Sequence, residues 1–285
     1  MKIGLGLPIS DPAALLDWAR RADAGPFSTL GLLDRVVYAN PEPLVTLAAL
    51  AGATSRIRLQ TEVLLAPLRD AALLAKQAAT LDRICGGRFV LGLGVGGRED
   101  DHIATGTDLR SRGARMDAQL AVLRRLWAGE PYGAGAGPVG PFPARAGGPE
   151  LLFGGFRPAA LARVARFGDG FLAAAPPSWA GQLFASVSRS WSEAGRPGRP
   201  RLVAQVNVAL GPSELAAEAA REIAAYYAFT GEAARVVDAL LTTPATIRTA
   251  IDAYADLGAD EVMLYCWAAD PTQVDRLAEL ASTLR

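Results

Sequence analysis

Short apolar runs alternate with longer amphipathic stretches from one end of the chain to the other. We predict eight strands, at residues 2–8, 27–33, 57–65, 88–94, 150–154, 170–174, 201–210 and 261–266. Each run is followed by a helical pattern, for example at residues 12–24, where Pro12 suits the first turn and Asp11 or Ser10 suits the cap. Alternating strands and helices are typical of βα units built on a parallel sheet.

The number of these units predicts the fold class. Eight strand and helix pairs in 285 residues fit a (β/α)₈ TIM barrel better than a doubly wound sheet, which typically has about five to seven strands. We therefore expect residues 1–285 to form one α/β barrel domain. Residues 129–148, rich in Gly, Pro and Ala, are predicted to form a long flexible loop, and residues 211–243 a helical insertion after the seventh strand.

The composition and the N-terminal sequence indicate which binding partners and which cellular compartment to expect for this protein. The 29 basic and 29 acidic side chains balance, which disfavours binding to nucleic acid. The apolar run at the N-terminus is too short and too rich in glycine for a signal peptide, and the chain has no apolar run of membrane-spanning length. We therefore expect a cytoplasmic protein without a membrane partner. Its two cysteines, Cys85 and Cys266, fall at opposite ends of the predicted barrel, so we expect no disulfide.

The sequence contains few residues of the types that usually carry catalysis. His102 is the only histidine, and the sequence has no Cys-x-x-Cys, Walker or Gly-x-Ser-x-Gly motif. We expect no metal site, and we expect an organic cofactor to bring the chemistry. His102 follows the fourth predicted strand and is a candidate for the active site, with an ordinary polar loop residue as the alternative.

Two glycine-rich strand ends are candidate ligand sites. Residues 92–97 match a dinucleotide-binding pattern, but no helix opens at the third glycine, so we interpret Gly94, Val95, Gly96 and Gly97 as a strand end that a planar ligand or a phosphate can approach. A purely steric turn is the alternative. Residues 154–157, Gly-Gly-Phe-Arg, precede a predicted helix and make a candidate phosphate cradle, with a tight turn and a solvated arginine as the alternative.

Charged residues end two further strands. Asp34, at the end of the second strand, can accept a hydrogen bond from a cofactor ring or pair with Arg35, and a surface ion pair of little energetic weight is the alternative. Glu62 lies between apolar neighbours at the end of the third strand. A carboxylate at the C-terminal mouth of a barrel is more often in the site than in the core, so we assign Glu62 to the site.

The sequence resembles the luciferase-like monooxygenases, a flavin- and deazaflavin-dependent family. Four stretches in fixed order carry the resemblance: NPEPL at 40–44, ATSRIRL at 53–59, LAKQAATLD at 74–82 and GGRFVLGLG at 86–94. Residues 165–171 and 270–278 add support. The resemblance implies a (β/α)₈ barrel, usually a homodimer, that binds reduced FMN or coenzyme F420 at the C-terminal face.

The resemblance also assigns residues. It implies a non-prolyl cis peptide bond at Glu62–Val63, behind the isoalloxazine ring. The family's glycine-rich strand end corresponds to residues 94–97, and its phosphate loop corresponds to Gly154, Gly155 and Phe156. Arg115 is a further phosphate candidate. The aromatic residues of the insertion, Tyr226, Tyr227 and Phe229, are expected to cover the mouth or to form a dimer contact.

Departures from the family pattern bear on the cofactor. Many members have a histidine where this chain has Arg35, and F420-dependent members have a glutamate where it has Gly97. We therefore predict an FMNH₂-dependent monooxygenase that oxidises a small organic substrate with O₂, fed by a flavin reductase, with Asp34, Arg35, Glu62 and His102 as catalytic candidates. An F420-dependent oxidoreductase acting on an imine, alkene or alcohol is the alternative, and a non-catalytic flavin-binding subunit is the third interpretation.

Overall fold

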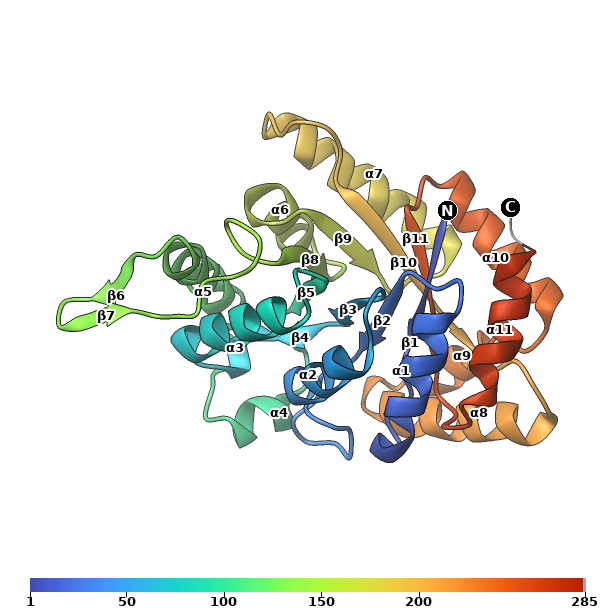
Figure 1. Ribbon diagram of the computed structural model, residues 1–285. Coiled ribbons are helices and arrows are strands. Elements are labelled where there is room, and N and C mark those ends of the chain that lie inside the picture. Colours follow the sequence, from blue (N-terminus) through green and yellow to red (C-terminus); the bar gives the residue numbers. More distant parts are fainter. Residues whose placement is uncertain (284–285) are drawn as a thin grey trace.

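The computed structural model describes residues 1–283 and contains a closed barrel of eight parallel strands (Figure 1). The barrel strands are β1 (Lys2–Gly6), β2 (Thr29–Leu32), β3 (Arg58–Thr61), β5 (Phe89–Gly94), β8 (Glu150–Gly154), β9 (Gly170–Ala173), β10 (Arg201–Val208) and β11 (Glu261–Cys266). Each strand pairs with the next, and β11 pairs with β1 to close the ring. The predicted (β/α)₈ barrel is thus confirmed.

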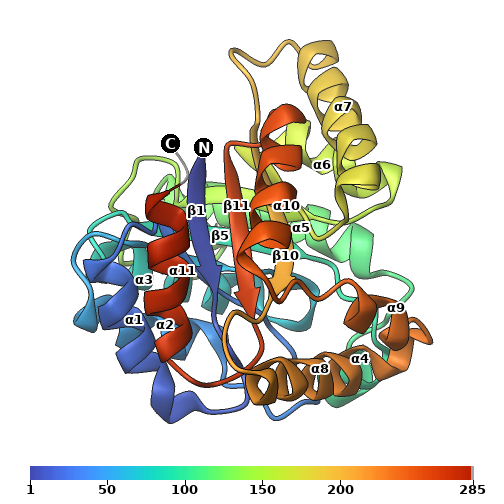
Figure 2. The same cartoon turned by 90° about the vertical axis from the view of Figure 1, so that its right-hand side faces the viewer.

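Helices surround the barrel, most of them along its outside (Figure 2). They are η1 (Pro12–Ala14), α1 (Leu15–Ala24), α2 (Pro43–Ala53), η2 (Ala66–Leu68), α3 (Ala71–Ile84), α4 (Glu99–Ala104), α5 (Arg112–Trp127), α6 (Pro158–Phe167), α7 (Pro177–Glu193), α8 (Ser213–Tyr227), η3 (Ala228–Thr230), α9 (Ala233–Asp238), α10 (Pro244–Asp256) and α11 (Thr272–Ser282). The Asp11 carboxylate caps the first of them by accepting the Ala13 N–H at 2.9 Å, as predicted. None of the helices described is long and apolar enough to cross a membrane.

Two apolar layers and one charged layer fill the protein. A large cluster lies between the sheet and the helices, and a smaller one comprises Val90, Leu152, Leu172, Val203 and Met263. Toward the N-terminal ends of the strands, charged side chains of β3, β8, β10 and β11 meet inside the barrel. Arg201 pairs there with Glu150 at 2.8 Å and with the fully buried Glu261, while Arg58 also pairs with Glu150.

The structure corrects two local predictions. Residues 129–148 are not a featureless loop, because β6 (Pro131–Gly133) and β7 (Ala136–Pro138) form an antiparallel hairpin that projects away from the barrel (Figure 1). The Ala134–Gly135 pair makes its two-residue turn, which sequence composition alone did not distinguish from a loop. The predicted strand at 57–65 is interrupted after Thr61 and resumes as β4 (Leu64–Leu65).

Other local predictions hold. The insertion at 211–243 is helical and comprises α8, η3 and α9. Cys85 and Cys266 are both free and buried.

Removing Arg201 should destabilise the barrel, because Glu261 would remain buried without its cationic partner. We expect Arg201→Met to lower the free energy of unfolding by about 3–5 kcal/mol. Arg199→Met is the matched control, since it removes an exposed arginine that pairs with Asp260, and should cost less than about 1 kcal/mol. Urea unfolding at pH 7 measures both changes, and equal effects of the two substitutions would contradict this account.

Candidate functional site

The carboxyl ends of the barrel strands meet at one end of the molecule, and the insertion lies across it. In Figure 2 the arrowheads of β1, β10 and β11 point toward α8. Two cavities open at this end, one of about 160 Å³ and one of about 680 Å³. Tyr226 lines the smaller cavity and Tyr227 the larger, with 4.9 Å between their ring centroids. The end of α8 therefore divides the mouth of the barrel into two neighbouring cavities.

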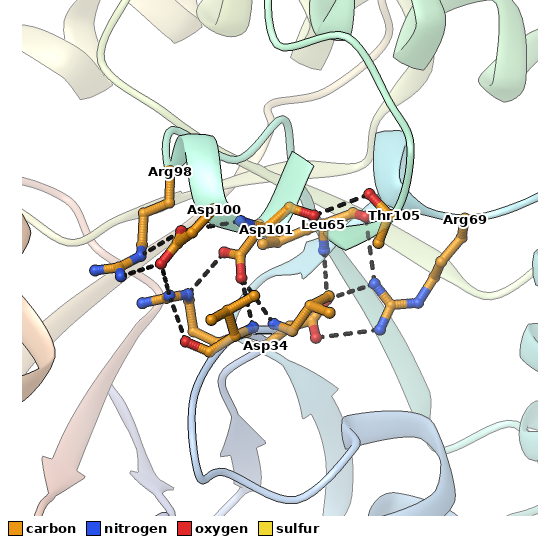
Figure 3. A network of polar contacts seen from close by, with 10 residues as sticks. Asp34, Leu65, Arg69, Arg98, Asp100, Asp101 and Thr105 are labelled. Carbon is orange, nitrogen blue, oxygen red and sulfur yellow. Dashed lines mark hydrogen bonds and ion pairs between the residues drawn. The ribbon is translucent and has the colours of Figure 1, made fainter. Parts of the chain in front are cut away.

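Asp34 connects the end of β2 to the segment that follows β3. Its Oδ2 accepts the Leu65 N–H at 2.8 Å and an Arg69 N–H at 2.6 Å, and its Oδ1 accepts a second Arg69 N–H at 3.1 Å (Figure 3). The Asp34 side chain is 1% exposed. The alternative in which Asp34 pairs with Arg35 is wrong, because Arg69 occupies the Asp34 carboxylate.

Arg35 pairs instead with Asp101 in α4. The Arg35 Nε donates to Asp101 Oδ2 at 2.7 Å, and both side chains are almost fully buried. The other Asp101 oxygen accepts the N–H groups of Val36 and Val37 at 3.0 and 2.7 Å. Sequence reasoning missed Asp101, whose only signal was its place in the acidic run after the fourth predicted strand.

Glu62 and Val63 occupy the break between β3 and β4. Their peptide bond is cis, as the family resemblance implied. The Val63 side chain packs on the glycine-rich strand ends: a Cβ added at Gly94 would lie 2.5 Å from Val63 Cγ2, and one at Gly154 would lie 3.2 Å from Cγ1. Glycine at position 94 is therefore a packing requirement.

Glu62 is a buried carboxyl group without a cationic partner. Gln60 Nε2 donates to its Oε1 at 2.8 Å, while its Oε2 is buried and makes no hydrogen bond. Burial raises the pKa of Glu62 to about 8; the Gln60 hydrogen bond opposes this rise, nearby Glu261 adds to it, and Arg201 opposes it. Glu62 is consequently protonated at neutral pH.

His102 lies behind the glycine-rich end of β5. It is 2% exposed, and its Nδ1 lies 2.9 Å from the Thr107 hydroxyl. Burial lowers the pKa of His102, and the charge of Arg112 lowers it further, so the ring is held neutral. The His102 Nε2 is buried without a partner and faces the backbone at Gly96, since a Cβ there would lie 3.5 Å from it.

The smaller cavity brings together much of the predicted site. Asp34, Arg35, Glu62, Val63, Gly96 and Gly97 all line it, with Leu65, Arg98, Asp101, Tyr226 and Phe229. His102, Gly94 and Val95 lie behind this lining and do not form part of it. Arg115 is exposed on α5, where its Nη2 donates to the Arg69 carbonyl at 3.5 Å, and it lines neither cavity.

The predicted phosphate loop belongs to the other side of the mouth. Gly155 has φ +143°, and a Cβ added there would lie 2.7 Å from the Ala160 Cβ, so a side chain does not fit. Phe156 lines the larger cavity, and the exposed Arg157 directly precedes α6, which has Pro158 in its first turn. The N-terminal end of this helix is therefore next to the cavity wall.

The larger cavity has aromatic walls and a polar strip. Phe156, Trp179, Tyr227 and Tyr254 supply the rings, while Gln205 and Asn207 of β10 supply the amides. Asn207 Oδ1 accepts the Trp267 Nε1–H at 3.0 Å. Sequence reasoning missed these amides, although two polar residues at alternate positions near the end of an apolar strand were a usable signal.

No metal centre accompanies these cavities in the described part of the chain. Residues 1–283 contain no group of three or more His, Cys, Asp or Glu side chains arranged to hold a metal ion.

Comparison with known proteins gives one family. The model described as luciferase-like monooxygenase matches residues 3–243. An uncharacterised protein of Mycobacterium tuberculosis is 34% identical over 163 residues, which are 54% of this chain and 56% of that protein. The chain thus spans about half the length of this curated relative.

Two solved structures share the fold along nearly the whole chain. The monooxygenase RslO1 from Streptomyces bottropensis matches with a TM-score of 0.82 and 23% identity, over 98% of this chain and 97% of that one. An F420-dependent secondary alcohol dehydrogenase in complex with an F420-acetone adduct matches with a TM-score of 0.82 and 17% identity, over 100% and 99%. At these identities the likeness shows the fold alone.

The raised pKa of Glu62 predicts a pH dependence of stability. Between the ordinary pKa of 4.5 and the folded value of about 8, the folded protein binds one more proton than the unfolded chain. Its free energy of unfolding should therefore fall across that window as the pH rises, and level off above it. In Glu62→Gln this decrease should be absent. Urea unfolding of both proteins at a series of pH values measures the difference, and parallel curves would show that Glu62 titrates normally.

Proposed function

Because this chain belongs to the luciferase-like monooxygenase family, we propose that it binds reduced FMN and oxidises a small organic substrate with O₂. The observation that carries the proposal is that charged side chains at the mouth are already engaged in ion pairs with each other. Asp34 is held by Arg69, and Arg35 is held by Asp101, so these groups are not free for acid–base chemistry. A bound flavin would supply the reactivity toward O₂, and the protein would supply orientation and shelter from water.

The larger cavity fits the ring system of FMN. Its volume of about 680 Å³ lies within the usual range of cofactor pockets, about 300–1,000 Å³. Trp179 and Tyr227 offer apolar walls for a planar ring. The amides of Gln205 and Asn207 offer donors and acceptors for the polar edge of such a ring. Val63, which contacts Gly154 at the end of β8, would lie between the ring and the smaller cavity.

The start of α6 fits the FMN phosphate. The positive end of the helix dipole favours an anion there, and Arg157 adds a cation. Phe156 connects this turn to the wall of the larger cavity. The predicted assignment of Gly154, Gly155 and Phe156 to the cofactor therefore remains part of the proposal.

The aromatic insertion would exclude water from the reacting groups. Tyr226 packs edge to face on Tyr38, with 5.4 Å between the ring centroids, and lies 5.1 Å from the Trp267 ring. Burial raises the pKa of Tyr227 to about 12, consistent with a ring that stays neutral inside the mouth. We assign the insertion the covering role, and we propose a homodimer supplied by a separate flavin reductase.

A second candidate is F420-dependent hydride transfer to a carbonyl or imine. The observation that favours it is the protonated Glu62 in the smaller cavity. The bound deazaflavin would supply a hydride to the substrate carbon, while Glu62 would give its proton to the substrate oxygen or nitrogen and regain one from solvent.

An anaerobic titration separates the two candidates. We expect FMNH₂ to bind and reduced F420 not to bind, as followed by absorbance and by quenching of tryptophan fluorescence. On admission of air the bound flavin should oxidise more slowly than free FMNH₂, because the mouth shields it. Selective binding of reduced F420, with no reaction on admission of air, would overturn the monooxygenase proposal in favour of the second candidate.

Arg157→Met tests the phosphate assignment. We expect about tenfold weaker binding of FMN and unchanged binding of riboflavin, because riboflavin lacks the phosphate that Arg157 would contact. Arg166→Met is the matched control, since it removes an exposed arginine from the other end of the same helix and should leave both affinities unchanged. An equal loss for FMN and riboflavin would rule out a phosphate contact.

A further inference from the structure

One buried glutamine interrupts the apolar inner face of α5. The other side chains that this helix buries are hydrophobic: Met116, Leu120, Leu123, Leu126 and Trp127. Gln119 lies among them and is 6% exposed, and its Oε1 is buried without a hydrogen-bond partner. A buried amide with one unsatisfied atom contributes little net stability compared with an apolar side chain of its size. Stability alone therefore does not account for a glutamine at this position.

The amide nitrogen of Gln119 bonds to the main chain at both ends of η2. It donates to the Ala66 carbonyl at 3.1 Å and to the Arg69 carbonyl at 2.7 Å. Ala66 begins η2 directly after β4, and Arg69 is the residue that follows η2. A single side chain of α5 therefore holds the short turn between β4 and α3 at two points.

This turn carries the arginine that binds Asp34. The Arg69 guanidinium donates to the two Asp34 oxygens at 2.6 and 3.1 Å, and Asp34 in turn accepts the Leu65 N–H at 2.8 Å (Figure 3). Gln119 fixes the main chain of Arg69, while Asp34 fixes the end of its side chain. The bonds of Gln119 are therefore linked to the amide of Leu65 through Arg69 and Asp34.

Val63 lies at the other end of these contacts. It directly precedes β4, whose second residue is Leu65. Its side chain packs against the glycines at the ends of β5 and β8, Gly94 and Gly154. A shift of β4 would therefore change how Val63 sits on these strand ends, where the proposed function places the flavin ring.

We propose that Gln119 is a positioning residue for the barrel mouth, which acts through the Ala66 and Arg69 carbonyls to hold Arg69 on Asp34 and Val63 on the strand ends. Gln119 lines neither cavity, so it supplies no group to a ligand. The inference rests on the proposed function for the ligand being FMN. The position of β4 can be measured without any ligand, which keeps the two proposals separable.

Hydrogen exchange followed by NMR in the cofactor-free protein tests the positioning role. Gln119→Met keeps the length of the side chain and removes its donors, so the Leu65 amide should exchange about tenfold faster. Amides of β10, which lies across the barrel from β3, should keep their rates. Gln273→Met is the matched control, because Gln273 is also buried and donates to a carbonyl, that of Ala268 at 3.0 Å. It should leave the Leu65 rate unchanged.

Gln119→Glu provides a rescue that depends on pH. Burial favours the neutral form of the introduced carboxyl group, which donates to one of the two carbonyls, whereas the ionised form donates to neither. We expect the protection of the Leu65 amide to be close to that of the wild type at pH 5 and to approach that of Gln119→Met at pH 9. The wild type at both pH values is the reference. A side chain that only fills space would show no such dependence.

Flavin binding gives the second readout. We expect Gln119→Met to weaken the binding of FMN and of riboflavin by the same factor, about fivefold, because Val63 would contact the ring and not the phosphate. Gln273→Met should bind both flavins as the wild type does.

The outcomes separate this inference from the proposed function. If the wild type binds no flavin while the Leu65 rate depends on Gln119 as expected, Gln119 positions the mouth and the cofactor proposal fails. If the Leu65 rate is unchanged in Gln119→Met, or if all amides accelerate alike through a loss of overall stability, the inference is overturned whatever the cofactor. Binding of FMN by Gln119→Met with the affinity of the wild type would overturn it as well.

Discussion

The carboxylate of Asp34 fixes the geometry of the barrel mouth. It joins the end of β2 to the amide of Leu65 in β4 and to the guanidinium of Arg69. A buried carboxylate is stable only with such partners. The hydrogen bonds of Asp34 therefore hold the segment after β3 in one position. Glu62 and Val63 precede β4 directly and are positioned by this contact. The next residue, Arg35, holds α4 in the same way through Asp101.

The charged groups at the mouth differ in how completely they are hydrogen-bonded. Asp34 and Asp101 have every carboxylate oxygen engaged, which makes them positioning residues. Arg35 and Glu62 each have one buried atom without a hydrogen-bond partner, while the larger cavity has aromatic walls and the amides of Gln205 and Asn207. In the proposed function a bound cofactor would supply the redox chemistry, and the protein would hold it, orient it and shield it from water.

The alternation of strands and helices made the barrel predictable, because eight βα units have few other ways to bury their apolar faces. The same logic predicted that Asp34, Arg35, Glu62 and Gly97 lie together, since carboxyl ends of parallel strands meet. The ionic partners were not predictable. Whether Asp34 pairs with Arg35 or with Arg69 depends on side-chain directions in three dimensions. The amides of Gln205 and Asn207, and the ring of Trp179, were missed because their cavity is assembled from segments far apart in the sequence.

A crystal structure of the protein with FMN tests the central claim, a flavin site at the barrel mouth, most directly. The account predicts the isoalloxazine ring in the larger cavity, with its polar edge toward Gln205 and Asn207 and its phosphate at the start of α6. It also predicts that Asp34 keeps its contacts with Leu65 and Arg69 in that complex. A phosphate bound at another strand end, or a ring outside the larger cavity, would contradict the account.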